Sequence, residues 1–287
     1  METFIIVGAG RVGTTLGFLL NQAGYRPLLI VDRYLSRAEK AVSFIGAGLS
    51  GTDHEEAAQH GDFLMLAVPD SAIAGLAESL SRTDASWENR IVFHCSGSLT
   101  ASVLDPLEKA GAATGSFHPL QTFSHPQTAV KRIRKSWFCL EGSKKFKQLA
   151  SSLVESLGGN IFEVSAEKKV LYHTAAVFAS NFLVVLMDQA AAIMSEAGLP
   201  KEEAEKALQP LAEGALSGIT ESGTVQALTG PVERGDYETV KAHLQVLDRL
   251  SPEAGQLYRA LSLRALHMAV RKESPDREKI RRLLQSK

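Results

Sequence analysis

The chain has 287 residues, more than one hydrophobic core usually organises, so two domains are expected. Its formal net charge is −1 and basic and acidic residues are interspersed, which argues against a nucleic-acid-binding surface or a charged tail. The two cysteines, Cys95 and Cys139, form no CxxC motif and no metal-ligand spacing. We therefore expect buried thiols in a reducing compartment, and no metal site.

Targeting signals are not evident. The N-terminus enters an apolar run at once, without a basic n-region or a cleavable h-region. The longest apolar run, residues 175–187, is interrupted by Ser180 and Asn181 and is short for a membrane span. We therefore expect a cytoplasmic protein that has no membrane partner.

The first predicted element is a strand at residues 3–7 that leads directly into glycines spaced G-x-G-x-x-G. In dinucleotide-binding loops, the first glycine (here Gly8) allows a tight turn and the second (Gly10) lets the pyrophosphate approach the backbone. The third, Gly13, lets the following helix at residues 14–23 pack closely on the strand. The pattern predicts a dinucleotide site, and the alternative is a glycine turn of purely structural use.

The second predicted strand, residues 28–32, ends in Asp32, where the ribose of a bound dinucleotide would lie. A carboxylate there accepts the ribose hydroxyls of NAD and repels the 2′-phosphate of NADP. Arg33 and Arg37 favour the opposite preference, because guanidinium groups bind phosphate. We expect a slight preference for NAD, with NADP as the alternative.

Three further strands are predicted at residues 63–68, 91–95 and 112–117, and the segments that follow them carry polar or small residues. Because ligands bind at the carboxyl ends of parallel strands, Ser96 and His118 are candidates for the site. The alternatives are that residues 96–98 only cap a helix and that His118 is packed or solvated.

Strands at residues 137–140 and 160–164 flank a predicted helix at 144–157, and the alternation of strands and helices predicts a doubly wound α/β sheet over residues 1–165. The residues expected to bind NAD(P) are Gly8, Ala9, Gly10, Arg11, Val12, Gly13, Asp32, Arg33, Arg37, Ala67, Val68, Pro69, Ser96 and Gly97.

From residue 166 the pattern is helical only, so residues 166–287 are predicted to form an all-α domain for substrate binding and dimerisation. Its predicted helices are residues 167–197, 201–217, 237–250, 253–272 and 276–284. The first of them is apolar on several faces and needs cover on most sides, which predicts a homodimer joined through this domain.

Polar residues on the long predicted helix fall within an arc of about 100° on a 3.6-residue period; they are His173, Ser180, Asn181 and Asp188. Buried polar groups need partners, so this stripe either pairs with other protein groups or faces the cofactor. We expect the catalytic residues to be His173, Asn181, Ser96 and His118.

A turn-rich segment at residues 229–236 separates two of the predicted helices. Thr229, Gly230, Arg234 and Asp236 are candidates for substrate binding. The alternative is an ordinary capped turn in which Asp236 is the N-cap of the following helix.

Several motifs together resemble one bacterial family, that of Rossmann-like proteins with a helical C-terminal domain of unknown function. The motifs are GAGRVG, AVPD, HCSG, SFHPLQTF, YHTAAVFASN and LTGPVERGD. The family is similar to the superfamily of 6-phosphogluconate and β-hydroxyacid dehydrogenases and of ketopantoate and pyrroline-5-carboxylate reductases. The resemblance implies a two-domain NAD(P)-dependent reductase.

In the β-hydroxyacid enzymes that this chain resembles, a proton-transferring lysine precedes an asparagine by four residues. Asn181 matches the asparagine, whereas Val177 stands at the lysine position, and His173 is the proposed substitute. At the second strand, Arg33 matches the NADP-using relatives and Asp32 departs from them.

These observations predict an oxidoreductase that reduces a small carbonyl substrate, such as a ketopantoate-like 2-keto acid, by hydride transfer between the domains. Two alternatives remain. One is a reductase of a cyclic imine acid, and the other is a dinucleotide-binding sensor without turnover.

Overall fold

The computed structural model describes residues 1–269 and 276–286, and it divides into two compact units, Met1–Asn181 and Phe182–Lys287. The boundary lies after the expected one at residues 165/166, because the segment that follows residue 165 contributes buried and hydrogen-bonded side chains to the first unit. The last residues of the helix predicted at 253–272 lie outside the described residues.

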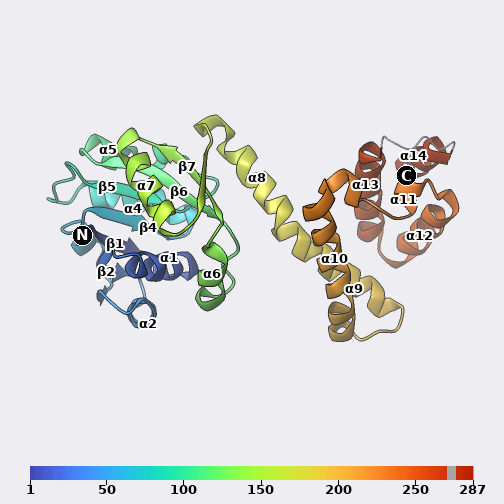
Figure 1. Ribbon diagram of the computed structural model, residues 1–287, viewed down its shortest axis with the longest axis horizontal. Helices are drawn as coiled ribbons and strands as arrows, with labels where there is room; N and C mark the ends of the chain where they lie inside the picture. Colours follow the sequence, from blue (N-terminus) through green and yellow to red (C-terminus); the bar gives the residue numbers. More distant parts are fainter. Residues whose placement is uncertain (270–275, 287) are drawn as a thin grey trace. The chain divides into compact units, whose positions relative to one another are not determined.

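The first unit is built on an eight-stranded sheet with the order β3-β2-β1-β4-β5-β6-β7-β8 (Figure 1). The strands are β1 Thr3–Val7, β2 Arg26–Val31, β3 Leu49–Gly51, β4 Phe63–Leu66, β5 Ile91–His94, β6 Ala113–Leu120, β7 Trp137–Gly142 and β8 Asn160–Glu163. Neighbouring strands are parallel except for the antiparallel pair β6–β7. This arrangement confirms the predicted sheet and adds the short β3, which has too few residues to give an alternation pattern.

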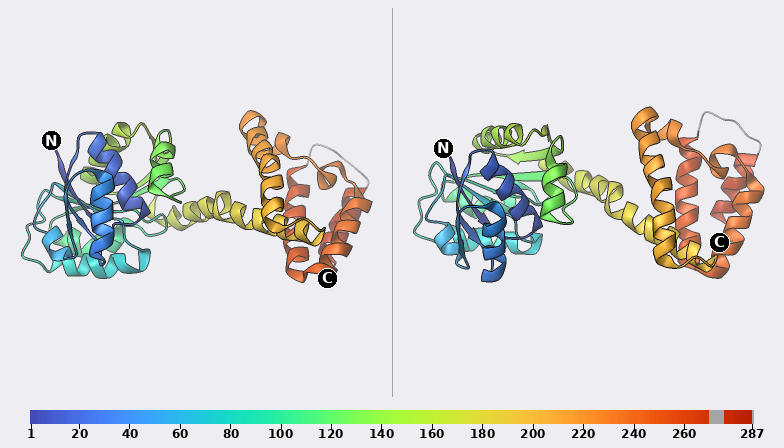
Figure 2. Two further views of the ribbon diagram at one scale, coloured as in Figure 1. Left: turned by 90° about the horizontal axis from the view of Figure 1, so that it is seen from below. Right: turned by 60° about the horizontal axis from the view of Figure 1, so that its bottom comes forward.

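Successive side chains of the central strands point to opposite faces of the sheet, and each face has its own apolar core. One face packs against α1 Arg11–Gln22, α2 Leu35–Ile45, α6 Pro126–Ile133 and α7 Lys144–Ser156. The other face packs against α3 His54–Ala57, α4 Asp70–Ser81, η1 Ala101–Leu104 and α5 Asp105–Lys109. Figure 2 shows the sheet between these two layers of helices. Strands buried on both faces explain the continuous apolar runs in the sequence.

Strand β6 is longer than the sequence pattern predicts. It pairs with β5 only as far as Ser116, but its antiparallel pairing with β7 continues to Leu120. His118 and Pro119 therefore lie within the strand and not after its end. The proline fits there because its missing N–H falls where the parallel neighbour has already ended.

The helix predicted at 167–197 is interrupted. A 3₁₀ turn, η2 Ala166–Lys168, leads into α8 Lys169–Ala179, and α9 Asn181–Glu196 follows after Ser180, whose φ of −123° and ψ of −68° are not helical. The predicted polar stripe assumed one continuous helix, so the break at Ser180 changes the angular relation between His173 and Asn181.

By length and composition alone, Ala166–Glu196 could cross a membrane: its most apolar window has a mean hydropathy of 1.8 and is not buried.

The second unit is helical in its described part, as predicted. It contains most of α9 and then α10 Lys201–Ala227, α11 Pro231–Arg234, α12 Tyr237–Leu250, α13 Pro252–Met268 and α14 Asp276–Gln285. Its apolar core joins α11 to α14 and includes Val240, Leu244 and Ile280. The long helices α9 and α10 each bury a single residue, Ala191 and Ala204.

Candidate functional site

The glycine loop between β1 and α1 has the three properties that a dinucleotide cradle requires. Gly8 has a φ of +108°, and a Cβ on it would lie 2.5 Å from the backbone of Ala67. A Cβ on Gly13 would lie 2.2 Å from the Gly8 carbonyl oxygen, so only glycine lets α1 approach β1. A Cβ on Gly10 would have only the Ala67 oxygen near it, at 4.0 Å. The backbone at Gly10 therefore faces open space, which fits the approach of a pyrophosphate to the N-terminus of α1.

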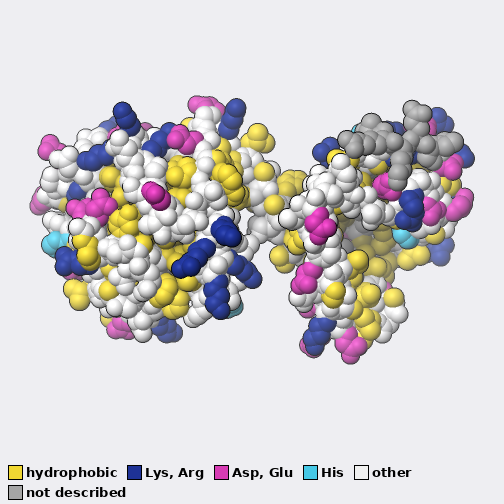
Figure 3. Space-filling model, viewed as in Figure 1, with side chains coloured by type: hydrophobic (Ala, Val, Ile, Leu, Met, Phe, Trp, Pro, Cys, Tyr) yellow, Lys and Arg dark blue, Asp and Glu magenta, His cyan; other side chains and the backbone are white. Residues whose placement is uncertain are grey.

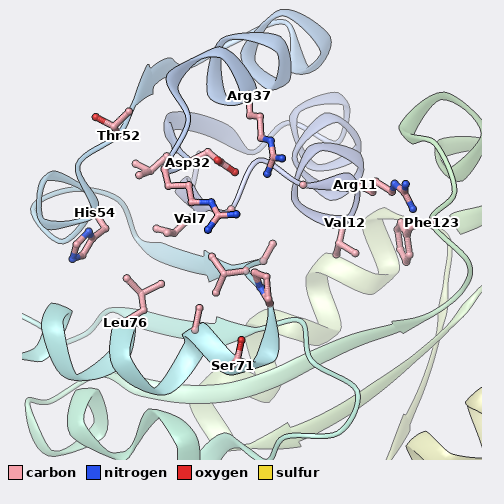
Figure 4. Close-up of a pocket in the computed structure, with 18 residues that line it drawn as sticks. Val7, Arg11, Val12, Asp32, Arg37, Thr52, His54, Ser71, Leu76 and Phe123 are labelled. Atoms are coloured by element: carbon pink, nitrogen blue, oxygen red, sulfur yellow. The ribbon is translucent and has the colours of Figure 1, made fainter.

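A cavity of about 650 Å³ extends from this loop along the carboxyl ends of β1, β2 and β4 (Figure 4). The predicted cofactor residues that line it are Gly8, Gly10, Arg11, Val12, Asp32, Arg33, Arg37, Ala67, Val68 and Pro69. Figure 4 shows Arg11 and Phe123 toward one end, and Thr52 and His54 toward the other. Among the predicted set, Ala9 lines a neighbouring cavity and Gly13 is packed inside the loop.

The carboxyl end of β2 carries the negative charge that favours NAD and the positive charges that favour NADP. Asp32 is held by the backbone: its Oδ2 accepts the Ala9 N–H at 3.1 Å, and its Oδ1 accepts the Tyr34 N–H at 3.1 Å. The guanidinium groups of Arg33 and Arg37 each lie 4.8 Å from the centre of the Tyr34 ring. Both arginines are exposed and line the cavity, so the aspartate is outnumbered by positive charge at this end.

His94 is fully buried and holds the loop after β5 through hydrogen bonds. Its Nδ1 accepts the Ser96 N–H at 3.1 Å, and therefore its Nε2 carries the proton that is donated to the Thr100 carbonyl oxygen at 3.1 Å. Burial is the main cause that lowers the pKa of His94 to about 4. A second proton would place an N–H against the Ser96 N–H, so the loop requires the neutral ring.

Asp70, the first residue of α4, also holds this loop through hydrogen bonds. Its Oδ2 accepts hydrogen bonds from the hydroxyls of Ser96 at 2.8 Å and Ser98 at 2.7 Å. Ser96 Oγ in turn accepts the Leu99 N–H at 3.1 Å, but this is a turn and not a helix cap, because η1 begins only at Ala101 and its N-cap residue is Thr100. Ser96 is thus a bridge between the loop and α4, and its hydroxyl is already engaged.

Two histidines converge over Gly97. A Cβ on Gly97 would lie 2.5 Å from His173 Nδ1 and 2.8 Å from His118 Nε2, and the two imidazole rings have centroids 5.9 Å apart. His173 Nδ1 is buried and has no hydrogen-bond partner in the described chain. On its other side, His118 Nδ1 lies 2.6 Å from the hydroxyl of Tyr172. The structure therefore brings Ser96, Gly97, His118 and His173 together, at the carboxyl ends of β5 and β6.

A buried lysine stands behind this histidine cluster. Lys169, the first residue of α8, has no exposed surface, and its Nζ donates a hydrogen bond to Ser116 Oγ at 2.7 Å. Ser116 in turn donates to the Ser96 carbonyl oxygen at 3.2 Å. Within the described residues Lys169 forms no ion pair, and burial lowers its pKa.

Burial and neighbouring charges set the protonation states of His118 and Tyr172. Burial, followed by the nearby Lys169 and His173, lowers the pKa of His118 to about 4. Burial raises the pKa of the Tyr172 hydroxyl above its ordinary value. At neutral pH the cluster therefore contains a neutral imidazole at 118 and a protonated phenol at 172.

Other predicted site residues lie apart from these two groups. Asn181 is exposed at the start of α9, and its side chain forms no hydrogen bond within the described chain. In the second unit, Thr229 and Arg234 are exposed and Gly230 is half-buried. Asp236 caps α12 by accepting the Thr239 N–H at 3.2 Å, as the alternative interpretation of this turn predicted.

Three polar residues of the cluster were not predicted from the sequence: Lys169, Tyr172 and Asp70. Lys169 and Tyr172 are three residues apart, so on a helix they share a face with His173 nearby, and this spacing is a signal that was available. Asp70 directly follows the Pro69 that was predicted to contact the cofactor. Cys95 is half-buried and Cys139 is buried, and burial raises the pKa of Cys95 to about 12 and also raises that of Cys139, so both thiols are unreactive.

Replacing His94 with Gln should make stability less dependent on pH. Because the folded-state pKa of His94 is lowered from 6.5 to about 4, its neutral form stabilises the protein fully above pH 6.5, and this contribution is lost as the pH falls toward 4. Between pH 7 and pH 5 the native protein should lose about 2 kcal/mol more unfolding free energy than H94Q. Urea unfolding at both pH values measures this, with exposed His60→Gln as the control. Equal losses in the native protein and H94Q would contradict the role of His94.

Comparison with known proteins agrees with the fold. A family model of a Rossmann-like domain matches residues 3–119, and the model of a domain of unknown function, DUF2520, matches residues 136–265. No curated protein matches the sequence.

Solved structures are similar over nearly the whole chain. A candidate NADP oxidoreductase from Bacteroides fragilis is 24% identical, with a TM-score of 0.76, and protein TM1727 from Thermotoga maritima is 26% identical, with a TM-score of 0.73. Pyrroline carboxylate reductase from Plasmodium falciparum, solved with NADP bound, is 13% identical, with a TM-score of 0.61. Each covers 93% of this chain and 98% of its own. The chain thus joins an N-terminal Rossmann-like domain to a C-terminal helical DUF2520 domain.

Proposed function

We propose that the chain is an NAD(P)-dependent oxidoreductase that reduces the carbonyl group of a small 2-keto acid. The observation that carries the proposal is the glycine loop with its open position at Gly10, which faces a cavity lined by cofactor-type residues. The histidine cluster, at the carboxyl ends of the next strands of the same sheet, supplies groups for proton transfer.

The residues of the cavity suit the parts of a dinucleotide. The N–H groups at the start of α1 would hold the pyrophosphate, and the charged end of β2 would hold the adenosine ribose. The apolar side chains of Val68 and Leu76 line the same cavity and would cover flat ring surfaces. When bound, a reduced nicotinamide supplies the hydride.

The chain's own residues supply the proton and orient the substrate. His118 and His173 are the candidates for proton transfer to the substrate oxygen, since their ring nitrogens converge over Gly97. Ser96 acts by fixing the loop that carries Gly97, because its hydroxyl is engaged with Asp70. Asn181 stays a predicted catalytic residue, and Thr229, Gly230, Arg234 and Asp236 stay predicted substrate-binding residues.

A carboxylate-bearing substrate fits the electrostatics. Among the charges that act on His118, the buried Lys169 ammonium comes first, so the potential at the cluster is positive. A 2-keto acid of the ketopantoate type presents a carboxylate next to the reacting carbonyl. A cyclic imine acid carries the same carboxylate, and it is the alternative substrate because pyrroline-5-carboxylate reductases share the fold.

We also propose a preference for NADP(H), which reverses the slight preference for NAD expected from Asp32. Both carboxylate oxygens of Asp32 already accept backbone N–H groups, while Arg33 and Arg37 flank Tyr34 at the cavity. Two guanidinium groups near the ribose suit a 2′-phosphate. The Bacteroides fragilis and Plasmodium falciparum proteins are both described with NADP.

Finally, we propose a homodimer joined through the long helices. Large apolar side chains are exposed along α8, α9 and α10, among them Leu171 at 70%, Val184 at 68% and Leu211 at 72%. Figure 3 shows hydrophobic side chains at the surface over this part of the chain. Apolar surface of this extent marks an interaction site, and a second copy would cover it with an equivalent apolar face.

A substrate screen tests the function. Purified protein should oxidise NADPH in the presence of a 2-keto acid from a panel that includes ketopantoate and cyclic imine acids. Gly10→Glu should abolish NADPH binding in calorimetry, because the new carboxylate occupies the pyrophosphate position. Gly75→Glu adds the same charge on α4, where a Cβ meets nothing within 4 Å, and should bind normally. Normal binding by G10E would refute the dinucleotide site; binding without turnover would favour a sensor, and turnover of imines alone would favour the imine reductase.

Cofactor preference has its own test. The double variant Arg33→Ala/Arg37→Ala should weaken NADPH binding by roughly 10- to 100-fold, the effect of losing charge-assisted hydrogen bonds to a phosphate, and should leave NADH binding nearly unchanged. Arg26→Ala removes one guanidinium group from the opposite end of β2 and is the control for loss of positive charge. A tenfold preference of the native protein for NADH would show that Asp32 dominates.

Light scattering tests the dimer. In detergent-free buffer at micromolar concentration the protein should have a mass of about 62 kDa, twice the 30.9 kDa of one chain. Val184→Asp should shift it toward the monomer, while Leu49→Asp, an equally exposed site in the first unit, should not. A monomeric native protein, or one that requires detergent to stay in solution, would refute the proposal.

A further inference from the structure

The hydroxyl of Tyr172 is the nearest hydrogen-bonding partner of His118. It lies 2.6 Å from His118 Nδ1, and the ring of Tyr172 makes edge contacts with His118 and Phe162, with centroid separations of 5.6 and 5.4 Å. These contacts come from β6, β8 and α8 and hold the phenol in one place. The hydrogen-bonded pair of His118 and Tyr172 is therefore held in place by the packing of the first unit.

The direction of this hydrogen bond can be inferred from the surroundings. Burial keeps Tyr172 protonated, and His118 is neutral, so one of its nitrogens carries a proton and the other accepts one. A phenol is a stronger donor than acceptor, which favours donation from Tyr172 to Nδ1. The proton of His118 then lies on Nε2, which faces the same point over Gly97 as the buried Nδ1 of His173, a nitrogen with no hydrogen-bond partner among the described residues.

We propose that Tyr172 is a positioning residue that fixes the Nε2–H tautomer of His118 and returns a proton to it through Nδ1. This inference rests on the oxidoreductase function proposed above. It answers the question of the proton donor, since neither a lysine at position 177 nor a charged His118 is available at neutral pH.

The protons balance without a charged imidazole. As the carbonyl carbon gains the hydride and its π bond opens, the oxygen takes the proton from His118 Nε2. His118 Nδ1 takes the hydroxyl proton of Tyr172 at the same time, so the ring changes tautomer and stays neutral. The half-buried phenolate then takes up from the solvent the one proton that the overall reduction consumes. In this scheme the low pKa of His118 is no obstacle, because the imidazolium form is never required.

The charged and titratable groups around His118 define the expected pH dependence. Lys169 from α8, His173 from α8 and His94 from β5 disfavour its protonation, and Asp70 from α4 favours it. The balance keeps His118 neutral above about pH 4. The rate should therefore vary little between pH 5 and 8 while Tyr172 is present.

Nitrogen NMR on protein labelled with ¹⁵N-histidine tests the tautomer directly. In the native protein His118 should show an unprotonated Nδ1 and a protonated Nε2, and Tyr172→Phe should lose this preference. Tyr258→Phe is the matched control, since Tyr258 lies 2.9 Å from His243 Nδ1 in the second unit, and it should leave His118 unchanged. A protonated Nδ1 in the native protein would overturn the proposal even if Y172F does not fold.

Kinetics provide a second readout. Y172F should bind NADPH as the native protein does and lose on the order of 10²-fold in turnover. Its remaining rate should fall as the pH rises, because the proton must then come from the rare imidazolium. Native turnover and a flat pH profile in Y172F would refute the proton-returning role. Failure of the native protein to bind any dinucleotide would instead refute the proposed function, and the NMR result would remain interpretable.

Discussion

The antiparallel pairing of β6 with β7 is the constraint on which the candidate site depends. In the parallel part of the sheet each strand ends at about the same level, and β5 pairs with β6 only as far as Ser116. Because β7 runs the other way, β6 keeps a hydrogen-bonded neighbour for four more residues, to Leu120. His118 therefore stands on rigid backbone beyond the end of β5, directly beside the loop at Gly97. The strand thus holds His118 Nε2 within 3 Å of the position that a Cβ on Gly97 would take, and α8 brings His173 Nδ1 to the same position.

The buried ammonium of Lys169 adds to the effect of burial, which is the main cause that keeps His118 and His94 neutral. A charge with no exposed surface and no ion-pair partner among the described residues is costly, and it is tolerated here through its hydrogen bond to Ser116. Its field disfavours protonation of His118 and His94 alike. A neutral imidazole has one donor and one acceptor, so the proton of His94 and the proton of His118 each have a defined position. Lys169 therefore affects the protonation of these histidines through its charge, although it has no exposed surface.

The sequence predicted those parts of the structure that follow from the periodicity of apolar residues and from glycine spacing. The alternation of strands and helices and the change to helices after residue 165 depend on local periodicity, and the fold confirms them. The polar stripe was wrong as a continuous helical face because Ser180 breaks the helix, a conformation that the apolar sequence around it does not signal. The spacing of Lys169 and Tyr172 places them on one helical face, but they were missed because the apolar sequence around them does not show that this face meets the sheet. Similarly, the sequence places Asp32 at the ribose position but cannot show that backbone N–H groups already engage its carboxylate.

Asp70 connects the two halves of the candidate site. It begins α4 immediately after Val68 and Pro69, which line the dinucleotide cavity, and its Oδ2 holds Ser96 and Ser98 on either side of Gly97. A carboxylate at a helix N-terminus is stabilised by the helix dipole, so it can accept two hydroxyls without a cationic partner. A shift of the β4–α4 turn on cofactor binding would therefore be transmitted through one side chain to the loop on which the histidines converge. The side chain of Asp70 thus ties the turn that lines the cavity to the loop at Gly97, beside which His118 and His173 lie.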